Sequence, residues 1–105
     1  MDSQMKKGFL EFCILLIMSK EEVYASDILA FLEEASLIAV EGTLYPLLSR
    51  LTKEELVKYR WEESKNGPPR KYYSLTSKGE EKLSNYKQAW SQLNSSINFL
   101  ISKYE

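Results

Sequence analysis

The chain of 105 residues contains no histidine and only one cysteine. It therefore lacks an imidazole base, a Cys-His pair and a Cys/His zinc cluster, which are common means of catalysis and metal binding. We expect no enzymatic activity, no catalytic residue, no cofactor and no metal site. The lone Cys13 cannot form an internal disulfide, which points to a reducing cytoplasm. Because Cys13 lies in the apolar segment 9–18, we expect a buried, unreactive thiol.

A long hydrophobic run is also absent. The longest, residues 13–18, is far too short to span a bilayer, and no small-residue cleavage site of a signal peptide follows it. We interpret it as part of a buried helix. The length of the chain fits one domain with a modest core.

The charge is almost balanced, with 14 Lys and Arg against 15 Asp and Glu. This slight acidity by itself argues against a nucleic-acid partner, but the distribution of charge favours one. Between residues 65 and 78 the chain has no acidic residue and four cations, namely Lys65, Arg70, Lys71 and Lys78. Such a local positive stripe is sufficient for phosphate contacts even in a neutral chain.

Hydrophobic periodicity predicts three helices in the first half of the chain. Residues 5–19 are apolar on nearly every side of a helix, which should therefore be covered on two faces. Ser26 is expected to cap a second helix, residues 27–35, with Asp27 at its positive end. Its inward-facing residues are Ile28, Leu29 and Leu32. A third helix follows the connection 36–40 and ends near Thr52.

The start of the third helix depends on Pro46. If the helix begins at Gly42 or Thr43, Pro46 lies in the first turn, where amides have no helical partner. If it begins at Glu41, Pro46 removes one backbone hydrogen bond. Both possibilities place Thr43 and Tyr45 at the amino end, where a helix in the major groove carries its reading side chains.

A hairpin follows the third helix. Val57, Tyr59 and Trp61 alternate with charged residues and predict a half-buried strand, the segment 64–69 has turn chemistry, and the segment 70–75 returns as a second strand. Tyr72 and Tyr73 face opposite sides of it, so one should be core and the other exposed. A helix with a basic hairpin is what a winged helix needs to enter a major groove and contact the flanking phosphates.

The last helix, which Ser77 and Glu80 are expected to open with a capping box, carries an apolar seam. Its apolar residues follow a 3-4-3-4-3-4 spacing, namely Leu83, Tyr86, Trp90, Leu93, Ile97, Leu100 and Tyr104. Such a seam packs against another helix at a shallow angle. The rest of the chain cannot cover about five turns of it, so we expect a two-fold dimer. The alternative is a helix folded back on its own domain.

Two segments, GTLYPLLSRL at 42–51 and GPPRKYYSLT at 67–76 together with Gly79, carry a resemblance to a known family. The chain resembles the PadR family of transcriptional regulators, in particular its short subgroup with a single carboxy-terminal dimerisation helix. The resemblance implies a mainly α fold with a small β-hairpin, namely a winged helix-turn-helix over residues 1–76 and a dimerisation helix over 77–105. It also implies a homodimer that represses from pseudo-palindromic operators, often with a hydrophobic effector that weakens DNA binding.

Two positions depart from the family pattern, since Ala25 and Glu55 stand where glycine is usual. A side chain costs about 1 kcal/mol or more in a left-handed helix terminus. The turn at Glu55 is therefore either built differently or strained. Neither position belongs to the residues expected to face the groove.

The resemblance assigns DNA contacts to the third helix and the wing. Thr43 and Tyr45 are expected at base edges or in the groove, Ser49 and Arg50 at the flanking backbone, and Lys65, Arg70 and Lys71 at phosphates. The competing interpretations are that Tyr45 packs into the core and that the charged hairpin is merely solvated. A winged-helix protein-interaction module without DNA binding is the alternative function. The net acidity and the absence of Lys or Arg at the start of the third helix favour that alternative, and the cations of the wing oppose it.

An effector site is expected around Trp90, which lies at the middle of the seam, where a two-fold axis brings both copies together. The first helix supplies Phe9 and Phe12, and Asn94 lies one turn past Trp90. Facing indoles can hold a flat aromatic molecule, and stacking contributes roughly 0.5–1.5 kcal/mol per ring pair. Since residues 82–103 contain no carboxylate, the expected ligand is neutral or phenolic, if there is one. Ordinary interface packing of Trp90 is the alternative.

Overall fold

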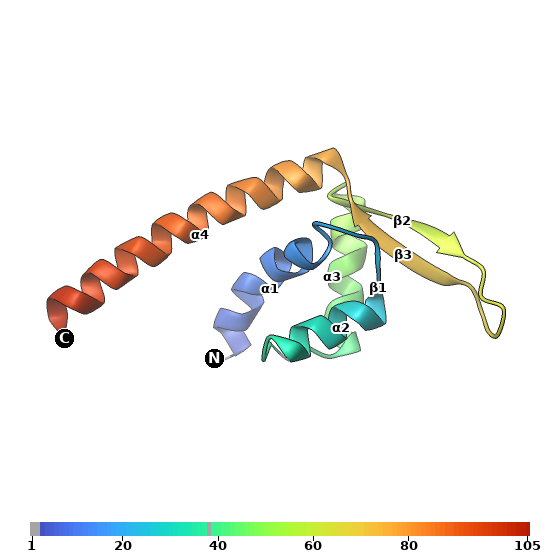
Figure 1. Cartoon of the computed structure of the whole chain (residues 1–105), viewed down its shortest axis with the longest axis horizontal. Coiled ribbons are helices and arrows are strands. Elements are labelled where there is room, and N and C mark those ends of the chain that lie inside the picture. Colours follow the sequence, from blue (N-terminus) through green and yellow to red (C-terminus); the bar gives the residue numbers. More distant parts are fainter. Residues whose placement is uncertain (1–2, 38) are drawn as a thin grey trace.

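The computed structural model describes residues 3–37 and 39–105, with side chains described from Phe9 onward. The elements follow in the order α1 (Ser3–Ile17), β1 (Val23–Tyr24), α2 (Ala25–Glu34), α3 (Glu41–Lys53), β2 (Val57–Glu62), β3 (Arg70–Leu75) and α4 (Ser77–Tyr104). Figure 1 shows α1, α2 and α3 gathered beside the sheet, with α4 extending away from them. Among the described residues, no helix has the length and apolarity needed to cross a membrane.

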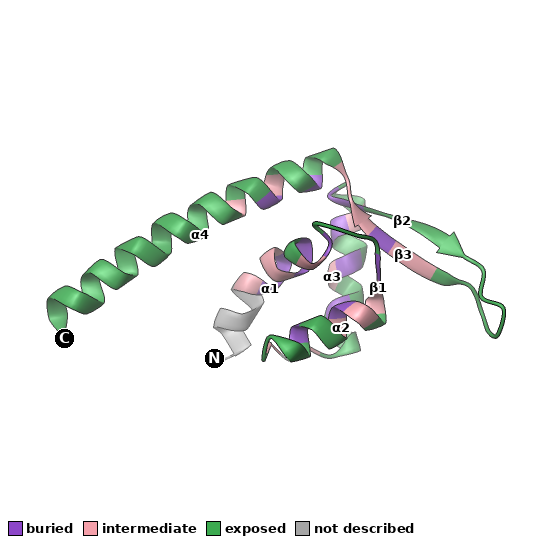
Figure 2. Cartoon of the chain, in the orientation of Figure 1, coloured by how far each residue is buried: buried purple, intermediate pink, exposed green. Residues whose placement is uncertain are grey.

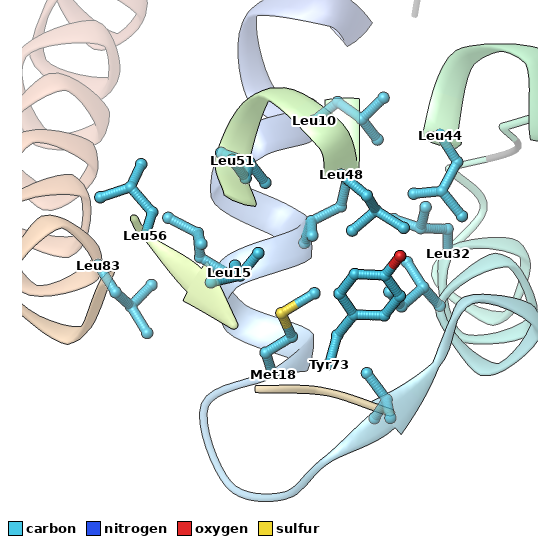
Figure 3. Packing of buried hydrophobic residues seen from close by; sticks show 14 residues of the cluster. Leu10, Leu15, Met18, Leu32, Leu44, Leu48, Leu51, Leu56, Tyr73 and Leu83 are labelled. Atoms are coloured by element: carbon cyan, nitrogen blue, oxygen red, sulfur yellow. The ribbon is translucent and has the colours of Figure 1, made fainter. Parts of the chain in front are cut away.

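The core lies where α1, α2 and α3 meet the sheet and the first turns of α4 (Figure 3). The expected inward face of α2 is confirmed, because Ile28 and Leu32 are fully enclosed and Leu29 is half-buried. Cys13 is half-buried beside this core, and burial raises the pKa of its thiol, as predicted. The residues with no exposed surface are Ile14, Leu15, Ile28, Leu44 and Leu51.

Two helix caps lie earlier than the sequence indicated. The cap of α2 is Tyr24, whose backbone N–H donates to Asp27 Oδ2 at 3.0 Å, and Ser26 is already the second residue of the helix. The cap of α4 is Thr76 rather than Ser77, and its Oγ1 accepts from the N–H of Gly79 at 3.0 Å. In both places a residue with extended backbone, the last of β1 or the one after β3, directly precedes the helix, and a cap needs that extended backbone.

The turn at the end of α3 is strained, which was one of the two interpretations that the sequence allowed for Glu55. Glu55 adopts a left-handed φ of 61°, where a side chain is disfavoured. The turn is closed by a backbone bond from Leu56 N–H to the Leu51 carbonyl at 3.0 Å. Thr76 Oγ1 donates to the Glu55 carbonyl at 2.5 Å. The start of α4 therefore holds this corner in place.

The sheet has three strands in the order β1-β3-β2. The pair β2–β3 was predicted, whereas β1 was missed because two residues are too short to show a period. Tyr73 is the core tyrosine. Tyr72 is half-buried rather than exposed, because it stacks on Tyr24 with ring centroids 3.9 Å apart. The prediction that β2 is half-buried was wrong beyond its first residue. Tyr59 and Trp61 are 44% and 60% exposed because the hairpin extends past the core (Figure 2).

Only the first turns of α4 are docked on the rest of the chain. Leu83 is buried and Tyr86 is half-buried, whereas every residue from Lys87 onward is exposed (Figure 2). A side chain at Gly79 would collide with the backbone carbonyl of Leu56, so glycine permits this close approach. The projecting helix gives a radius of gyration of 15.9 Å, against about 13 Å for a compact chain of 100 residues. The helix does not fold back along its own domain.

Candidate nucleic-acid interface

The helix α3 turns its apolar residues inward and its predicted DNA-contacting residues outward. It begins at Glu41, so Pro46 lies beyond the first turn and removes one helical hydrogen bond, to the carbonyl of Gly42. Tyr45 is 48% exposed and is not part of the core, which rules out the competing interpretation of this residue. The other predicted contact residues of the helix, Thr43, Ser49 and Arg50, are exposed as well.

The wing is the hairpin of β2, β3 and the loop between them. Two of its cations lie over aromatic rings. The guanidinium of Arg70 lies 5.2 Å from the ring centroid of Tyr24. The ammonium of Lys71 lies 4.2 Å from the ring of Tyr59 and 5.2 Å from that of Trp61. These contacts orient the long side chains while their charges stay accessible to water. Lys65 is exposed in the connecting loop.

A groove brings the two predicted sets of residues together. The groove lies between the wing and α3 and has a volume of about 320 Å³. Tyr45 lines that groove from α3, and Arg70 and Lys71 line it from the wing. Its other lining residues are Tyr24, Ala25, Ser26 and Tyr73. The three side chains therefore border one concave surface, although Thr43, Ser49 and Lys65 do not line it.

Arg50 has partners within the chain that its sequence position did not indicate. Its Nη2 lies 2.6 Å from Glu11 Oε1, and its Nη1 lies 3.0 Å from Glu54 Oε2. Five residues of helix place Arg50 about 140° around α3 from Tyr45. The two side chains therefore lie on opposite flanks of the exposed face, with Arg50 on the flank toward α1.

Sequence reasoning missed Glu11, which is 8% exposed on α1. It accepts hydrogen bonds from Arg50 and from the hydroxyl of Tyr86, and Lys82 Nζ lies 3.4 Å away. The signal that could have identified it is a lone carboxylate in the apolar segment 9–18. A charge at such a position needs a partner.

The aromatic residues predicted for an effector lie together between α1 and α4, with one exception. Phe9 and Trp90 meet edge to face with centroids 5.5 Å apart, and Phe12 stacks on Tyr86 at 5.3 Å. They border a hollow of about 120 Å³, whose lining does not include Asn94. Ligand pockets usually measure about 300–1,000 Å³, so this hollow is smaller than a typical ligand site.

The helix pair α2–α3, the three-stranded sheet and the outward-facing α3 define a winged helix-turn-helix protein. Among the described residues, no cluster of His, Cys, Asp and Glu is suited to hold a metal ion.

Comparison with known proteins assigns the family. Residues 14–85 match the model of the transcriptional regulator PadR-like family. A PadR-like transcription factor from Bacteroides fragilis is 56% identical, with 93% of this chain and 95% of that chain covered and a TM-score of 0.82. A PadR-like transcriptional regulator from Bacillus cereus is 43% identical over 94% and 97% of the two chains, with a TM-score of 0.84. The chain belongs to the PadR-like family of transcriptional regulators.

A third structure contains DNA. Bacillus subtilis PadR, solved in complex with operator DNA, is 28% identical, with a TM-score of 0.69 over 73% of this chain and 45% of that chain. The predictions of a winged helix-turn-helix fold and of a DNA-binding transcriptional regulator rather than an enzyme are confirmed by the family.

Proposed function

We propose that the protein is a dimeric repressor that binds a pseudo-palindromic operator in the cytoplasm and is released by a small aromatic effector. The observation that carries the DNA-contacting part is the groove shared by Tyr45, Arg70 and Lys71. A reading residue of α3 and two cations of the wing border one surface, as insertion of a helix between flanking phosphates requires. The related Bacillus subtilis PadR was solved in complex with operator DNA, which supports DNA as the partner.

In this proposal α3 enters the major groove. Tyr45 and Thr43 contact base edges from its amino end, where the helix dipole also favours a nearby phosphate. Ser49 contacts the adjoining backbone, and Arg50, already bound to two carboxylates, lies at the edge of the contact. Lys65, Arg70 and Lys71 neutralise phosphates on the wing side.

The dimer in this proposal is formed by α4 in residues 77–105, with the winged helix in residues 1–76. The seam residues beyond Tyr86 are exposed in a single chain, namely Trp90, Leu93, Ile97, Leu100 and Tyr104. A contiguous apolar surface of this kind marks an interaction site. A second copy covers it with the same residues about a two-fold axis, which matches the two-fold symmetry of a palindromic operator.

The effector site would be completed by the second copy. The hollow beside Phe9, Phe12 and Trp90 is too small in one chain for a drug-sized molecule. Two such hollows meeting at the axis, with Asn94 nearby, would enclose a planar ligand. Since residues 82–103 carry no carboxylate, a neutral or phenolic ring should bind more tightly than a cationic one. Titrating both kinds of dye against Trp fluorescence tests this, and tighter binding of the cations would contradict it.

The salt dependence of binding tests the DNA-contacting part. A dimer with about six to ten phosphate contacts loses ~10³–10⁵ in affinity between roughly 50 and 200 mM salt. We expect this for a duplex from the region upstream of the gene, measured by fluorescence anisotropy. A protein-interaction module would show no such binding.

The wing can be tested in the same assay. Arg70→Ala combined with Lys71→Ala should weaken binding to all sequences about equally and flatten the salt slope by about two units for each protomer. Lys87→Ala combined with Lys103→Ala removes two exposed cations from α4 and serves as the matched control. If the salt dependence of the wing variant were unchanged, the wing would not contact DNA phosphates.

A further inference from the structure

Glu11 is a charged group placed among apolar side chains. It lies within α1 and is the only charged residue that is buried in the described part of the chain. Without partners, a carboxylate at such a site would be strongly destabilising. Its surroundings therefore have to supply compensating groups, and the positions of those groups are informative.

Two helices supply the partners of Glu11, one to each carboxylate oxygen. Oε1 accepts a hydrogen bond from Arg50 Nη2 of α3 at 2.6 Å. Oε2 accepts one from the hydroxyl of Tyr86 of α4 and lies 3.4 Å from Lys82 Nζ of the same helix. A carboxylate is one planar group with two oxygens. A movement of α4 that displaces Oε2 therefore also turns the oxygen that Arg50 binds.

The contacts favour the ionised carboxylate and the neutral phenol. Burial by itself raises the pKa of Glu11, but hydrogen bonds from Tyr86 and Arg50 and the charge of Lys82 outweigh it, so the pKa lies below its ordinary value. Burial and the bond to Glu11 raise the pKa of Tyr86 to about 12. At neutral pH the Tyr86 hydroxyl therefore keeps its proton and donates it, and the ionised Glu11 carboxylate accepts hydrogen bonds at both oxygens.

Among the partners of Glu11 given above, Arg50 is the one that lies on α3. Glu54, the other partner of Arg50, lies four residues along the same helix, so it orients the guanidinium within α3. Glu11 lies on another helix, so its bond fixes α3 relative to α1. The buried leucines of α3 fix it in the core, and Arg50 adds a polar contact through which its position also depends on α1.

The connection to α4 passes through Tyr86. Its ring stacks on Phe12 with centroids 5.3 Å apart and borders the same hollow as Trp90. Tyr86 is also the last seam residue of α4 that is not exposed. A rearrangement of the aromatic cluster or of the seam would therefore displace the Tyr86 hydroxyl.

We propose that Glu11 is a positioning residue through which Tyr86 of α4 sets the position of Arg50, and with it the recognition helix. The inference rests on the proposed DNA-contacting function of α3. Through the contacts of Tyr86 with Glu11 and of Glu11 with Arg50, a change at the proposed effector site or in the apolar seam of α4 would shift α3. A change at Tyr86 then alters DNA affinity although α4 does not contact DNA.

A double-mutant cycle on DNA affinity tests this coupling. Tyr86→Phe removes the hydroxyl and keeps the ring that stacks on Phe12. We expect it to weaken binding to a duplex selected by the protein from a random-sequence pool by about 3- to 10-fold, part of the strength of one hydrogen bond to a charged group. In an Arg50→Gln background, the same substitution should change affinity by less than about twofold, because no guanidinium is left to position.

Tyr104→Phe is the matched control, since it removes an exposed hydroxyl near the end of the same helix. It should leave affinity unchanged in both backgrounds. Thermal unfolding and sedimentation establish that each variant is folded and equally associated at the assay concentration. If Tyr86→Phe does not fold, Lys82→Gln repeats the cycle at the same oxygen, with an expected loss of about 2- to 3-fold.

Two results would overturn the inference while leaving the proposed function intact. One is an equal loss on Tyr86→Phe in both backgrounds, which would show that the hydroxyl acts independently of Arg50. The other is an unchanged affinity of Tyr86→Phe in the wild-type background. A selection from which no duplex is retained would instead contradict the DNA-contacting function itself.

Discussion

Two surfaces of the molecule are exposed, namely the DNA-contacting surface proposed for α3 and the wing, and the part of α4 beyond Tyr86. The first is mainly polar and charged, whereas the second is apolar. The wing carries cations over aromatic rings and an ion pair between Arg60 and Glu22 at 2.7 Å. Such groups are hydrated and need no partner to be stable in water. The outer part of α4 exposes apolar side chains in one seam, Trp90 through Tyr104. This comparison indicates that the first surface is stable in a single chain, whereas the exposed apolar seam favours a covering partner, which the proposed dimer would supply.

The largest expected effect comes from placing charge in the seam. Ile97→Glu combined with Leu100→Glu should yield a monomer, because burying carboxylates without partners opposes association. Because a monomer cannot bind both half-sites of the operator at once, its affinity for the operator should fall at least ~100-fold. Sedimentation velocity and anisotropy measure the two effects. Ser95→Glu combined with Ser102→Glu adds the same charge to the opposite side of α4 and should stay dimeric. A dimeric seam variant would contradict the comparison.

The next effect separates the docked start of α4 from its free remainder. Gly79→Ala should destabilise the protein by about 2–3 kcal/mol, because the new methyl group collides with the Leu56 carbonyl. Ser95→Ala, in the exposed part of the same helix, should stay within about 0.5 kcal/mol of wild type. Urea unfolding compares the two. Equal stabilities would mean that the start of α4 is not docked as described.

At the proposed DNA-contacting surface, Tyr45→Ala should reduce discrimination between operator and altered duplexes by about 1–3 kcal/mol. Stability should change by less than about 1 kcal/mol, because the side chain lies outside the core. Competition binding measures the first quantity and urea unfolding the second. Tyr59→Ala, at similar exposure on the wing, should leave the sequence preference unchanged. Retained discrimination in Tyr45→Ala would assign the reading of sequence to other residues.

A smaller effect concerns acid stability. The pKa of Glu11 in the folded protein lies below the ordinary value of 4.5. Its contribution to the free energy of unfolding is therefore complete above about pH 4.5 and is lost as the pH falls through the folded value. Glu11→Gln should accordingly lose less stability than wild type between about pH 5 and pH 3. Denaturant unfolding at several pH values measures this, and parallel curves would show that the carboxylate contributes nothing.

The smallest effect is expected at the corner between α3 and β2. Glu55→Gly should raise stability by about 0.5–1 kcal/mol, because glycine adopts the left-handed φ of 61° without strain. Lys53→Gly, two residues earlier in a helical conformation, should have the opposite sign and cost about 1 kcal/mol. A lower melting temperature of Glu55→Gly would indicate that the entropy of glycine outweighs the relief of strain.

Local patterns were sufficient where neighbouring residues decide the structure. The inward face of α2 and the hairpin follow from periodicity and turn chemistry. The contact roles of Tyr45, Arg70 and Lys71 were expected from the family resemblance, and these three residues border one groove. The caps at Tyr24 and Thr76 were placed one or two residues late. Strands that run into helices supply the extended cap residue there, and Ser26 and Ser77 have the commoner cap chemistry.

Other features required the tertiary structure. Tyr59 and Trp61 alternate like half-buried strand residues, but none of the helices and strands that the structure describes lies over that end of the hairpin. Whether an alternating strand is covered depends on what packs against it, which its own sequence does not encode.

The sequence by itself determined the order of the four helices and the hairpin, the wing chemistry and the apolar seam of α4, because each depends on residues close together in the chain. Only the tertiary structure decided which charges meet. Glu11 binds partners 39 and 75 residues away, and such pairs leave no local pattern, since packing of three helices brings them together. The same packing left the seam uncovered, because the domain ends where its core is complete, near Tyr86.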